Sequence, residues 1–424
     1  SEDIEKPGIL NSNLGMYRIQ MSGNDYIKNK EIGLHYQLHR GIGIHQKNAN
    51  KLGKPLKVSI FIGGPPAHTF AAVMPLPEGM SEISFAGVLA KRRFRYARKD
   101  GYTISMDADF VICGDIYDND IKPEGPFGDH LGYYSLTHDF PVMQVKKVYA
   151  KDDAIWPFTV VGRPPQEDSQ FGALIHEITG NAIGKEIPGL KAVNAVDAAG
   201  VHPLLLAIGS ERYTPFNSLK RPQELLTIAN HILGTGQMSL AKYLIICDEV
   251  DSLNVANEEE FITHFLNIVD WQRDLHFQTK TTIDTLDYSG DSLNEGSKVV
   301  IAAAGAKKRI LSTNKDMINL PSGFSNLRMV SAGNLVVQGD GNINNLISAL
   351  EKQDLNDIGL ITLVDDTEFV SKDFSNWLWV TFTRSNPAVD IYGLDAKIIN
   401  KHFSCSLPII DARVKPHHAP VLER

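Results

Sequence analysis

The sequence predicts a two-domain protein of mixed α+β and α/β class, with a mainly antiparallel barrel or sandwich followed by a mostly parallel α/β sheet. The chain has 424 residues and 43% hydrophobic content, which is too large for one ordinary domain. Up to about residue 160, short strand candidates are separated by Gly, Asp and Asn. From about residue 190, short apolar runs alternate with amphipathic stretches, as alternating strands and helices do.

The first domain contains strand and helix signals of ordinary kinds. Residues 57–62 form an apolar strand candidate that Gly63-Gly64-Pro65-Pro66 ends, and Pro66 suits the first turn of a helix through Met74. Ser81 suits the N-cap of a further helix that begins at Glu82. Other strands are expected over 92–98, 108–116 and 142–150.

The second domain follows a break at Gly162-Arg-Pro-Pro and a helix expected over 171–178. We place the boundary so that the domains are residues 1–175 and 176–424. Amphipathic stretches predict helices over 223–233 and 258–269, and a polar helix is expected over 342–356. Short apolar runs predict strands at 204–208, 243–247, 299–304, 359–364 and 407–411.

Composition excludes several classes of protein. A net charge of −8 with 22% charged residues predicts no general binding of nucleic acid or anionic lipid. The three cysteines are far apart, with no CxxC, as in proteins whose thiols stay reduced. No apolar run approaches the ~20 residues that span a bilayer, and the first residues carry no signal pattern, so we expect a cytoplasmic protein.

Two polar stretches near the start could bind a metal or a phosphate. In Asn13-Leu-Gly-Met-Tyr-Arg18, the amide oxygen suits a hard cation and the guanidinium suits a phosphate or carboxylate, although for this motif alone a turn before a strand with a solvated Arg is the simpler explanation. Three histidines at 35, 39 and 45 fall within eleven residues. The glycines at 33, 41 and 43 argue against a helix there, and on a strand His35, Gln37 and His39 would share a face. The alternative is a polar surface.

Three carboxylates are further candidates. Glu82 would complement a helix dipole, or it could be aimed at a metal by the prolines and glycine before it. In Glu124-Gly-Pro-Phe-Gly-Asp129, a stiffened turn separates two acids, which in a cleft would be driven to different pKa values. An acidic surface loop is the competing interpretation.

Taken in order, these stretches resemble the UbiD family of decarboxylases. The matching motifs are Asn13-x-Gly-x-x-Arg18, His39-Arg-Gly, Ser-Glu82-x-x-Phe-Ala-Gly and Glu124-Gly-Pro-Phe-Gly-Asp129-His-x-Gly-Tyr-Tyr. Gly162-Arg-Pro-Pro, Thr285-Leu-Asp-Tyr-Ser and Gly296-Ser-Lys are similar to family signatures too. The resemblance runs from about residue 10 to the Lys-Pro-His-His near the end and is greatest to the long bacterial branch that includes 3-octaprenyl-4-hydroxybenzoate decarboxylases.

The resemblance implies a split β-barrel flavin-binding domain followed by an α/β domain with a role in dimerisation. It implies non-oxidative, reversible decarboxylation of an aromatic or α,β-unsaturated acid, with prenylated FMN, Mn²⁺ and K⁺. Ubiquinone or menaquinone biosynthesis, with a polyprenyl-hydroxybenzoate or naphthoate substrate, would fit. A flavin prenyltransferase would supply the cofactor, the chain would form a homo-oligomer (a dimer or hexamer), and a polyprenylated substrate would bring it into peripheral contact with a membrane.

The resemblance also assigns residues to roles. The implied Mn²⁺ ligands are Asn13, His39 and Glu82, and His35 or His45 could replace His39. The implied cofactor contacts are Met16, Tyr17, Arg18, His35, Tyr36, Gln37, Arg40 and Gly41, with Lys220 as a candidate for the phosphate. Backbone carbonyls of Ala71, Ala72 and Met74 would hold K⁺. Arg18, Glu124 and Asp129 would form the catalytic network, with Asp129 as the acid that protonates carbon after CO2 leaves.

The chain also departs from the family pattern. Family members usually carry a sizeable segment ahead of the Asn-containing motif, so we expect part of the first domain to be absent from this sequence. Two other functions therefore stay open: an FMN-binding oxidoreductase on the same kind of barrel, and a non-catalytic subunit that holds no cofactor.

Overall fold

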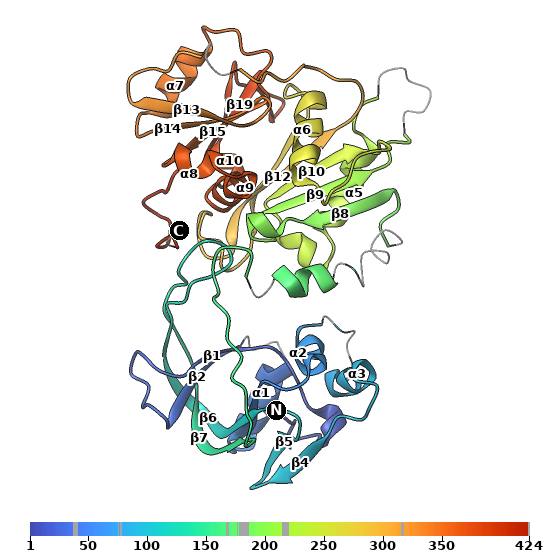
Figure 1. The fold of residues 1–424 in the computed structure, drawn as a ribbon, viewed down its shortest axis with the longest axis vertical. Coiled ribbons are helices and arrows are strands. Elements are labelled where there is room, and N and C mark those ends of the chain that lie inside the picture. The colour runs from blue at the N-terminus through green and yellow to red at the C-terminus, as the bar shows by residue number, and fades with distance from the viewer. Residues whose placement is uncertain are drawn as a thin grey trace. The chain divides into compact units, whose positions relative to one another are not determined.

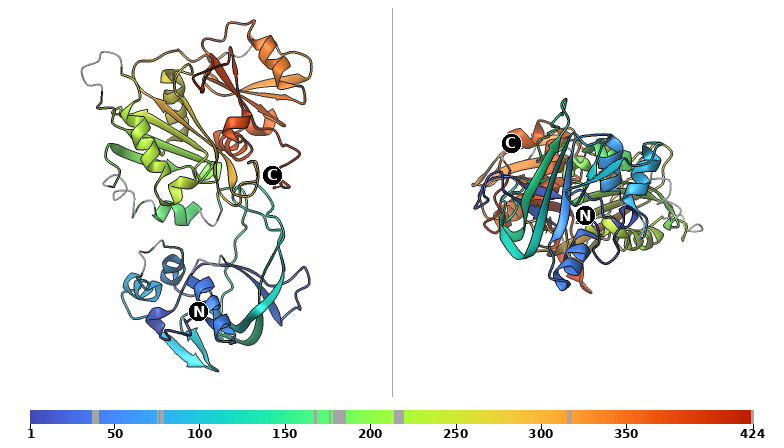
Figure 2. Two further views of the ribbon diagram at one scale, coloured as in Figure 1. Left: turned by 180° about the vertical axis from the view of Figure 1, so that it is seen from behind. Right: turned by 90° about the horizontal axis from the view of Figure 1, so that it is seen from below.

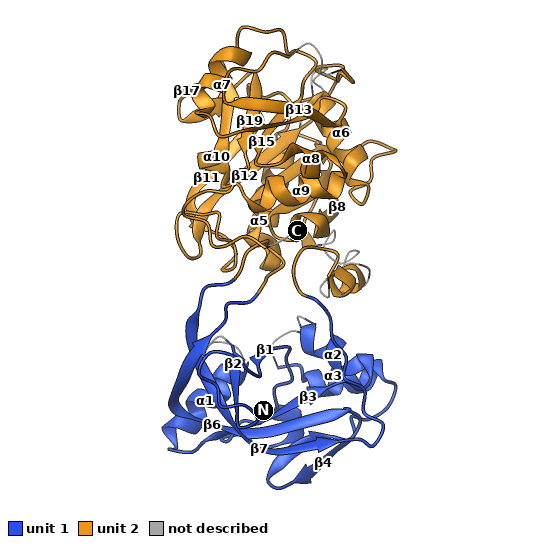
Figure 3. Ribbon diagram, turned by 60° about the vertical axis from the view of Figure 1, so that its left-hand side comes forward, with its two compact units in different colours: residues 1–127, 135–160 blue, residues 128–134, 161–424 orange. Residues whose placement is uncertain are grey.

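The computed structural model describes residues 1–36, 41–74, 76, 79–166, 169–175, 177, 186–213, 220–314 and 318–422. The chain divides into two compact units, each described here by itself (Figure 3). Unit 1 comprises Ser1–Phe127 and Ser135–Val160, and unit 2 comprises Gly128–Tyr134 and Val161–Arg424. The predicted division at residue 175 stays a prediction. No described helix is long and apolar enough to cross a bilayer.

Unit 1 is built on an antiparallel sheet with strand order β1-β2-β7-β6-β3 (Figure 1). Its strands are β1 (Arg18–Gln20), β2 (Glu31–His35), β3 (Leu56–Ile62), β6 (Phe110–Glu124) and β7 (His138–Ala150). The β6–β7 pair extends from Phe110↔Ala150 to Glu124↔His138 with two register shifts, and such shifts increase local twist. The sheet therefore curves as the long β6–β7 pair does in Figure 1 and Figure 2, forming a half-barrel.

Short helices and a hairpin complete unit 1. They are η1 (Ile9–Asn11), α1 (Gly41–Lys51), α2 (Pro66–Val73), α3 (Glu82–Leu89) and the pair β4 (Tyr96–Lys99) and β5 (Tyr102–Ser105). Ile42 and Ala49 of α1 pack against Leu34 and Ile116 of the sheet, because the apolar side of the helix faces the sheet. This packing places the start of α1 beside the segment before β1.

Unit 2 contains two five-stranded sheets, each with three parallel strands flanked by antiparallel edges. The first has the order β11 (Leu275–Thr282), β12 (Glu295–Ala303), β10 (Tyr243–Asp248), β9 (Leu204–Gly209) and β8 (Leu190–Ala195). The second has the order β13 (Phe324–Ser331), β14 (Asn334–Gly339), β15 (Leu360–Val364), β19 (Leu407–Asp411) and β16 (Ile391–Leu394). The central strands are buried on both faces, which is why they are apolar throughout.

Helices and short elements surround these sheets. Among the described residues of unit 2, 169–175 are helical, and the further α-helices are α5 (Glu224–Leu233), α6 (Glu258–Ile268), α7 (Ile343–Leu350), α8 (Thr367–Ser371), α9 (Phe374–Thr383) and α10 (Pro387–Asp390). The others are η2 (Asp197–Ala199), η3 (Gly236–Leu240) and the hairpin β17 (Lys397–Ile399) and β18 (His402–Ser404).

Most predicted elements are confirmed. All five apolar runs of the second domain are strands, and Ser81 caps α3 by accepting a hydrogen bond from Ser84 N at 3.4 Å. The expected strand over 92–98 begins only at Tyr96, and the polar helix over 342–356 ends at Leu350. As the glycines led us to expect, His35 lies on a strand, β2, and not on a helix, whereas Gly41 and Gly43 belong to α1, which was not predicted. The predicted helix over 171–178 lies partly outside the described residues, and 169–175 are helical.

Candidate active site

Arg18 and Glu124 form the central contact of unit 1. Arg18 begins β1 and pairs with His35 on β2, while Glu124 ends β6. Nε of Arg18 donates to Oε1 of Glu124 and Nη2 donates to Oε2, both at 2.7 Å. This two-point arrangement fixes orientation as well as distance, because guanidinium and carboxylate are both planar. The structure thus brings together two of the three predicted catalytic residues, 106 positions apart.

The Glu124 carboxylate is buried, with its side chain 1% exposed, whereas that of Arg18 is 26% exposed. Burial acts to raise the pKa of Glu124, but the hydrogen bonds and charges of His35 and Arg18 outweigh it, so the pKa lies below the ordinary value of 4.5. Glu124 is therefore a carboxylate at neutral pH. Arg18 is the partner that solvent or a ligand can reach.

The turn after Glu124 is held by polar side chains from the segment around β1. Gly125 has φ 91°, a conformation that favours glycine, and its N–H donates to Oε1 of buried Gln20 at 2.9 Å. Asn24 Nδ2 donates to the carbonyls of Pro123 and Gly125 at 2.8 and 2.9 Å. These bonds position the end of β6 and hence the Glu124 side chain. Gln20 and Asn24 were not predicted, because no sequence signal distinguishes them.

Aromatic rings and His35 surround the ion pair. The Arg18 guanidinium lies 4.7 Å from the centre of the Phe127 ring, and His35 stacks on Phe140 at 4.0 Å. Nδ1 of His35 is 2.8 Å from Arg18 Nη2 and 3.4 Å from Glu124 Oε2. A guanidinium only donates, so a neutral His35 ring accepts from Arg18 at Nδ1 with its proton on Nε2, whereas a protonated ring donates from Nδ1 to Glu124. His35 therefore orients Arg18.

Tyr26 lies near this group without having been predicted. Burial, followed by the charge of Glu124, raises its pKa to about 12. Its hydroxyl is buried and has no hydrogen-bond partner among the described residues. The hydroxyl stays protonated and could donate to a bound group.

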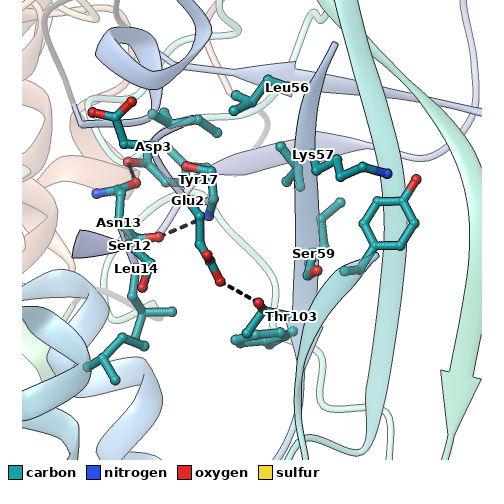
Figure 4. A pocket seen from close by; sticks show the side chains of 18 of the residues that line it. Glu2, Asp3, Ser12, Asn13, Leu14, Tyr17, Leu56, Lys57, Ser59 and Thr103 are labelled. Carbon is teal, nitrogen blue, oxygen red and sulfur yellow. Dashed lines mark hydrogen bonds between the residues drawn. The ribbon is translucent and has the colours of Figure 1, made fainter. Parts of the chain in front are cut away.

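A cavity of about 550 Å³ lies in unit 1 next to β1. Asn13, Met16, Tyr17 and Ala72 line it, so it contains several of the residues that were predicted to hold a cofactor, a metal or K⁺. Figure 4 shows Asn13 and Tyr17 on one side of the cavity and residues of β3 on the other. Its volume is in the usual range for a small-molecule site.

The residues predicted to hold Mn²⁺ fit a hard divalent ion in the part that is described. Asn13 Oδ1 is oriented by the Tyr17 hydroxyl, which donates to it at 2.6 Å. Gly41 leaves room for this amide, since a Cβ there would lie 2.6 Å from Asn13 Nδ2. Glu82 begins α3 behind its Ser81 cap. An amide oxygen and a carboxylate suit Mn²⁺. Within the described ranges, no group of three His, Cys, Asp or Glu residues forms a metal site.

The remaining residues that were predicted to bind the cofactor, Mn²⁺ or K⁺ lie in several different environments. Gln37, His39 and Arg40 lie outside the described residues. The hydroxyl of buried Tyr36 donates to Gln46 Oε1 at 3.4 Å, and burial raises its pKa. His45, on α1, is buried, with Nδ1 3.0 Å from Ser1 Oγ. The Ala72 carbonyl accepts from Met16 N at 3.3 Å, and Ala71 and Met74 are the neighbouring candidates for K⁺. Lys220, in unit 2, donates to Asp248 Oδ2 at 2.7 Å.

Asp129 belongs to unit 2, unlike Arg18 and Glu124. Its loop is held by the end of the chain, because Tyr134 N donates to Pro420 O at 2.7 Å and Leu422 N donates to Gly132 O at 2.9 Å. Asp129 is buried and Oδ1 accepts from Leu131 N at 3.1 Å. Its predicted role in catalysis stays a prediction.

Comparisons with known proteins show the family of both parts of the chain. Residues 3–164 match the model of the 3-octaprenyl-4-hydroxybenzoate carboxy-lyase Rift-related domain, and residues 169–303 match that of the C-terminal domain of the same carboxy-lyase. The chain is 35% identical over 433 residues to a 4-hydroxybenzoate decarboxylase subunit of Chlamydia pneumoniae, covering 99% of this chain and 70% of that protein. An uncharacterized protein of Chlamydia trachomatis is 35% identical over 415 residues, covering 97% and 69%.

Solved structures share the fold. The open form of Sedimentibacter hydroxybenzoicus vanillic acid decarboxylase (ShVdcCD) has a TM-score of 0.58 at 21% identity, covering 74% of this chain and 65% of that one. HmfF of Pelotomaculum thermopropionicum, a UbiD-class enzyme in complex with FMN, has a TM-score of 0.58 at 19% identity, covering 73% and 65%. The chain thus spans just under two thirds of the length of these solved relatives.

Proposed function

Because the chain belongs to the UbiD family of carboxy-lyases, we propose that it catalyses the non-oxidative, reversible decarboxylation of an aromatic or α,β-unsaturated acid with prenylated FMN and Mn²⁺. The family is shown by both domain models and by relatives of similar sequence. The cofactor proposal is supported by solved relatives that are described in complex with FMN and prenylated FMN.

The Arg18–Glu124 pair is the observation that carries this proposal. Nε and Nη2 of Arg18 are occupied by Glu124 and His35, and among the described residues no hydrogen bond is made by Nη1. Buried Glu124 holds the guanidinium in one orientation. The two N–H groups of Nη1 can then receive a substrate carboxylate, which is a pairing that guanidinium favours. Arg18 would thus orient the group that leaves as CO2.

The cofactor would be held by residues beside the cavity. Asn13 and Glu82 would bind Mn²⁺, and Met16 and Tyr17 would contact the cofactor. Bound prenylated FMN would supply the electron sink for the electrons left when CO2 departs. Phe127 and Phe140 would exclude water from the charged pair.

Asp129 is proposed as the acid that protonates the carbon that lost CO2. The proposal comes from the family motif, in which it is the second acid after Glu124. The substrate class is proposed from the relative in Chlamydia pneumoniae, whose name points to 4-hydroxybenzoate. Polyprenyl-hydroxybenzoate and naphthoate, a homo-oligomeric state and a cytoplasmic location are further predictions.

The test is direct. The chain is produced together with a flavin prenyltransferase, and the purified protein is examined by absorption spectroscopy, mass spectrometry and metal analysis. CO2 release is then measured from 4-hydroxybenzoate and a panel of aryl and enoic acids. Glu124→Gln should lower the rate at least about 100-fold, as loss of a group needed in the transition state does. Full activity of Glu124→Gln in protein that carries cofactor would refute the proposal.

A further inference from the structure

Four titratable side chains from three segments of unit 2 form a row that begins at Asp129. Oδ1 of Asp129 lies 3.1 Å from Nδ1 of His130. The His130 ring meets the His202 ring edge to face, with 6.3 Å between centroids and 73° between planes. Nδ1 of His202 makes a short hydrogen bond to Oδ2 of Asp284. The side chains are 9 to 21% exposed, so the row is sheltered but within reach of water.

The backbone that presents His202 is strained. Val201 has φ 69°, and a β-branched residue is an outlier in this left-handed region. Such a residue is strained and persists only where the surroundings impose its conformation. Here Val201 N donates to Val196 O at 3.0 Å and His202 N donates to Gly200 O at 2.9 Å. The fold thus accepts strain in the turn that directs His202 toward Asp284 and His130.

The far end of the row is a fixed negative charge. Asp284 Oδ1 accepts from Leu286 N at 2.9 Å. Burial acts to raise its pKa, but the hydrogen bond from His202, the charges of both histidines and the Leu286 N–H outweigh burial and hold the pKa below its ordinary range. Two carboxylates therefore flank two imidazoles, and either imidazole can carry a proton against a negative neighbour.

We propose that His130 is the residue that returns a proton to Asp129 after each turnover, with His202 and Asp284 stabilising its charged form. This rests on the proposed function, in which Asp129 gives its proton to carbon. The Asp129 carboxylate then takes the Nδ1 proton of the His130 imidazolium, so one N–H bond breaks and one O–H bond forms. The neutral ring regains a proton from water. His130 thus acts through Asp129 and touches no substrate.

The first experiment compares early and later turnovers of holoenzyme with 4-hydroxybenzoate as the probe. His130→Gln should leave the first turnover close to wild type, because that turnover uses the proton that the proposed function assigns to Asp129, and should slow later turnovers about 100-fold. Imidazole in the buffer should restore the later turnovers. His231→Gln, an exposed histidine of α5, is the matched control and should have no effect. An equal loss in first and later turnovers with no rescue by imidazole would overturn the proposal.

A second measurement needs no activity. The ring signals of His130 are assigned by NMR from their loss in His130→Gln, and their pH titration is followed in wild type and Asp129→Asn. Because Asp129 and His130 exchange one proton in the proposal, replacing the carboxyl by an amide should shift the titration of His130, with His231 unchanged. An unchanged His130 titration would overturn the proposed coupling. If the wild type releases no CO2 from any acid, the proposed function fails, and this titration still reports whether the two groups are coupled.

Discussion

Removing the charge of Glu124 should destabilise unit 1 as well as abolish activity. Breaking a buried ion pair typically costs about 3–5 kcal/mol, because the remaining charge is left without its partner. In Glu124→Gln the remaining charge is Arg18, whose side chain is 26% exposed and regains some hydration. We therefore expect destabilisation by about 2–4 kcal/mol for Glu124→Gln and by about 3–5 kcal/mol for Arg18→Met, which leaves the buried Glu124 carboxylate without its guanidinium partner.

The double variant tests whether the loss of unfolding free energy comes from breaking the Arg18–Glu124 ion pair. Arg18→Met with Glu124→Gln should cost at least about 1 kcal/mol less than the sum of the single variants, because no charge is orphaned. The assay is urea denaturation with hydrogen–deuterium exchange of peptides from β1, β2 and β6, which reports on unit 1 alone. Lys280→Met is the control, since Lys280 is 70% exposed in its pair with Asp291 and its loss should leave the stability close to that of wild type.

The stabilisation that Glu124 provides should depend on pH. The pKa of Glu124 is lower in the folded protein than its ordinary value of 4.5, so its stabilisation is complete above that value and is lost as pH falls through the folded pKa. The difference in unfolding free energy between wild type and Glu124→Gln should thus be constant near neutral pH and shrink below about pH 4.5. Single-variant costs that add to within about 0.5 kcal/mol, or a difference that does not change with acid, would refute this account.

Three further predictions concern other parts of the chain. Gly41→Ala should lower Mn²⁺ affinity about 10–100-fold by displacing the Asn13 amide, measured by calorimetry, and wild-type affinity would contradict the close approach. Tyr17→Phe should lower the Mn²⁺ affinity less than Gly41→Ala does, because Asn13 loses one hydrogen bond but keeps its position. A larger loss of affinity in Tyr17→Phe than in Gly41→Ala would contradict this reasoning. Lys242→Met should destabilise unit 2 by about 3–5 kcal/mol in thermal denaturation, because it leaves Asp287 buried 2.9 Å from the lost ammonium, and adding Asp287→Asn should recover part of the loss.

Much of the fold follows from local patterns in the sequence. Strands such as Leu204–Gly209 and Tyr243–Asp248 are buried on both faces, so the apolar run that stabilises them is visible in the sequence. Caps such as Ser81 act over three residues and are equally visible. The motifs from Asn13 to Asp129, taken in order, were enough to identify the family that both domain models match.

Contacts between distant residues were beyond such patterns. Arg18, His35 and Glu124 meet because β1, β2 and β6 belong to one sheet, and the order β1-β2-β7-β6-β3 cannot be derived from the periodicity of any single strand. Gln20 and Asn24 hold the turn after Glu124 from about 100 positions away, and they resemble ordinary surface residues in the sequence.

The motif Glu124-Gly-Pro-Phe-Gly-Asp129 shows most clearly what the sequence determines and what only the tertiary structure decides. In the sequence it is one short turn with two acids. In the structure Glu124 is held by the sheet of unit 1, whereas the Asp129 loop is bonded to the end of the chain and lies beside His130, His202 and Asp284 of unit 2. Residue types and spacing identify which side chains can do acid–base chemistry. Their partners depend on hydrogen bonds and packing between segments far apart in the sequence, such as Gly132 and Leu422, which meet only when the chain folds.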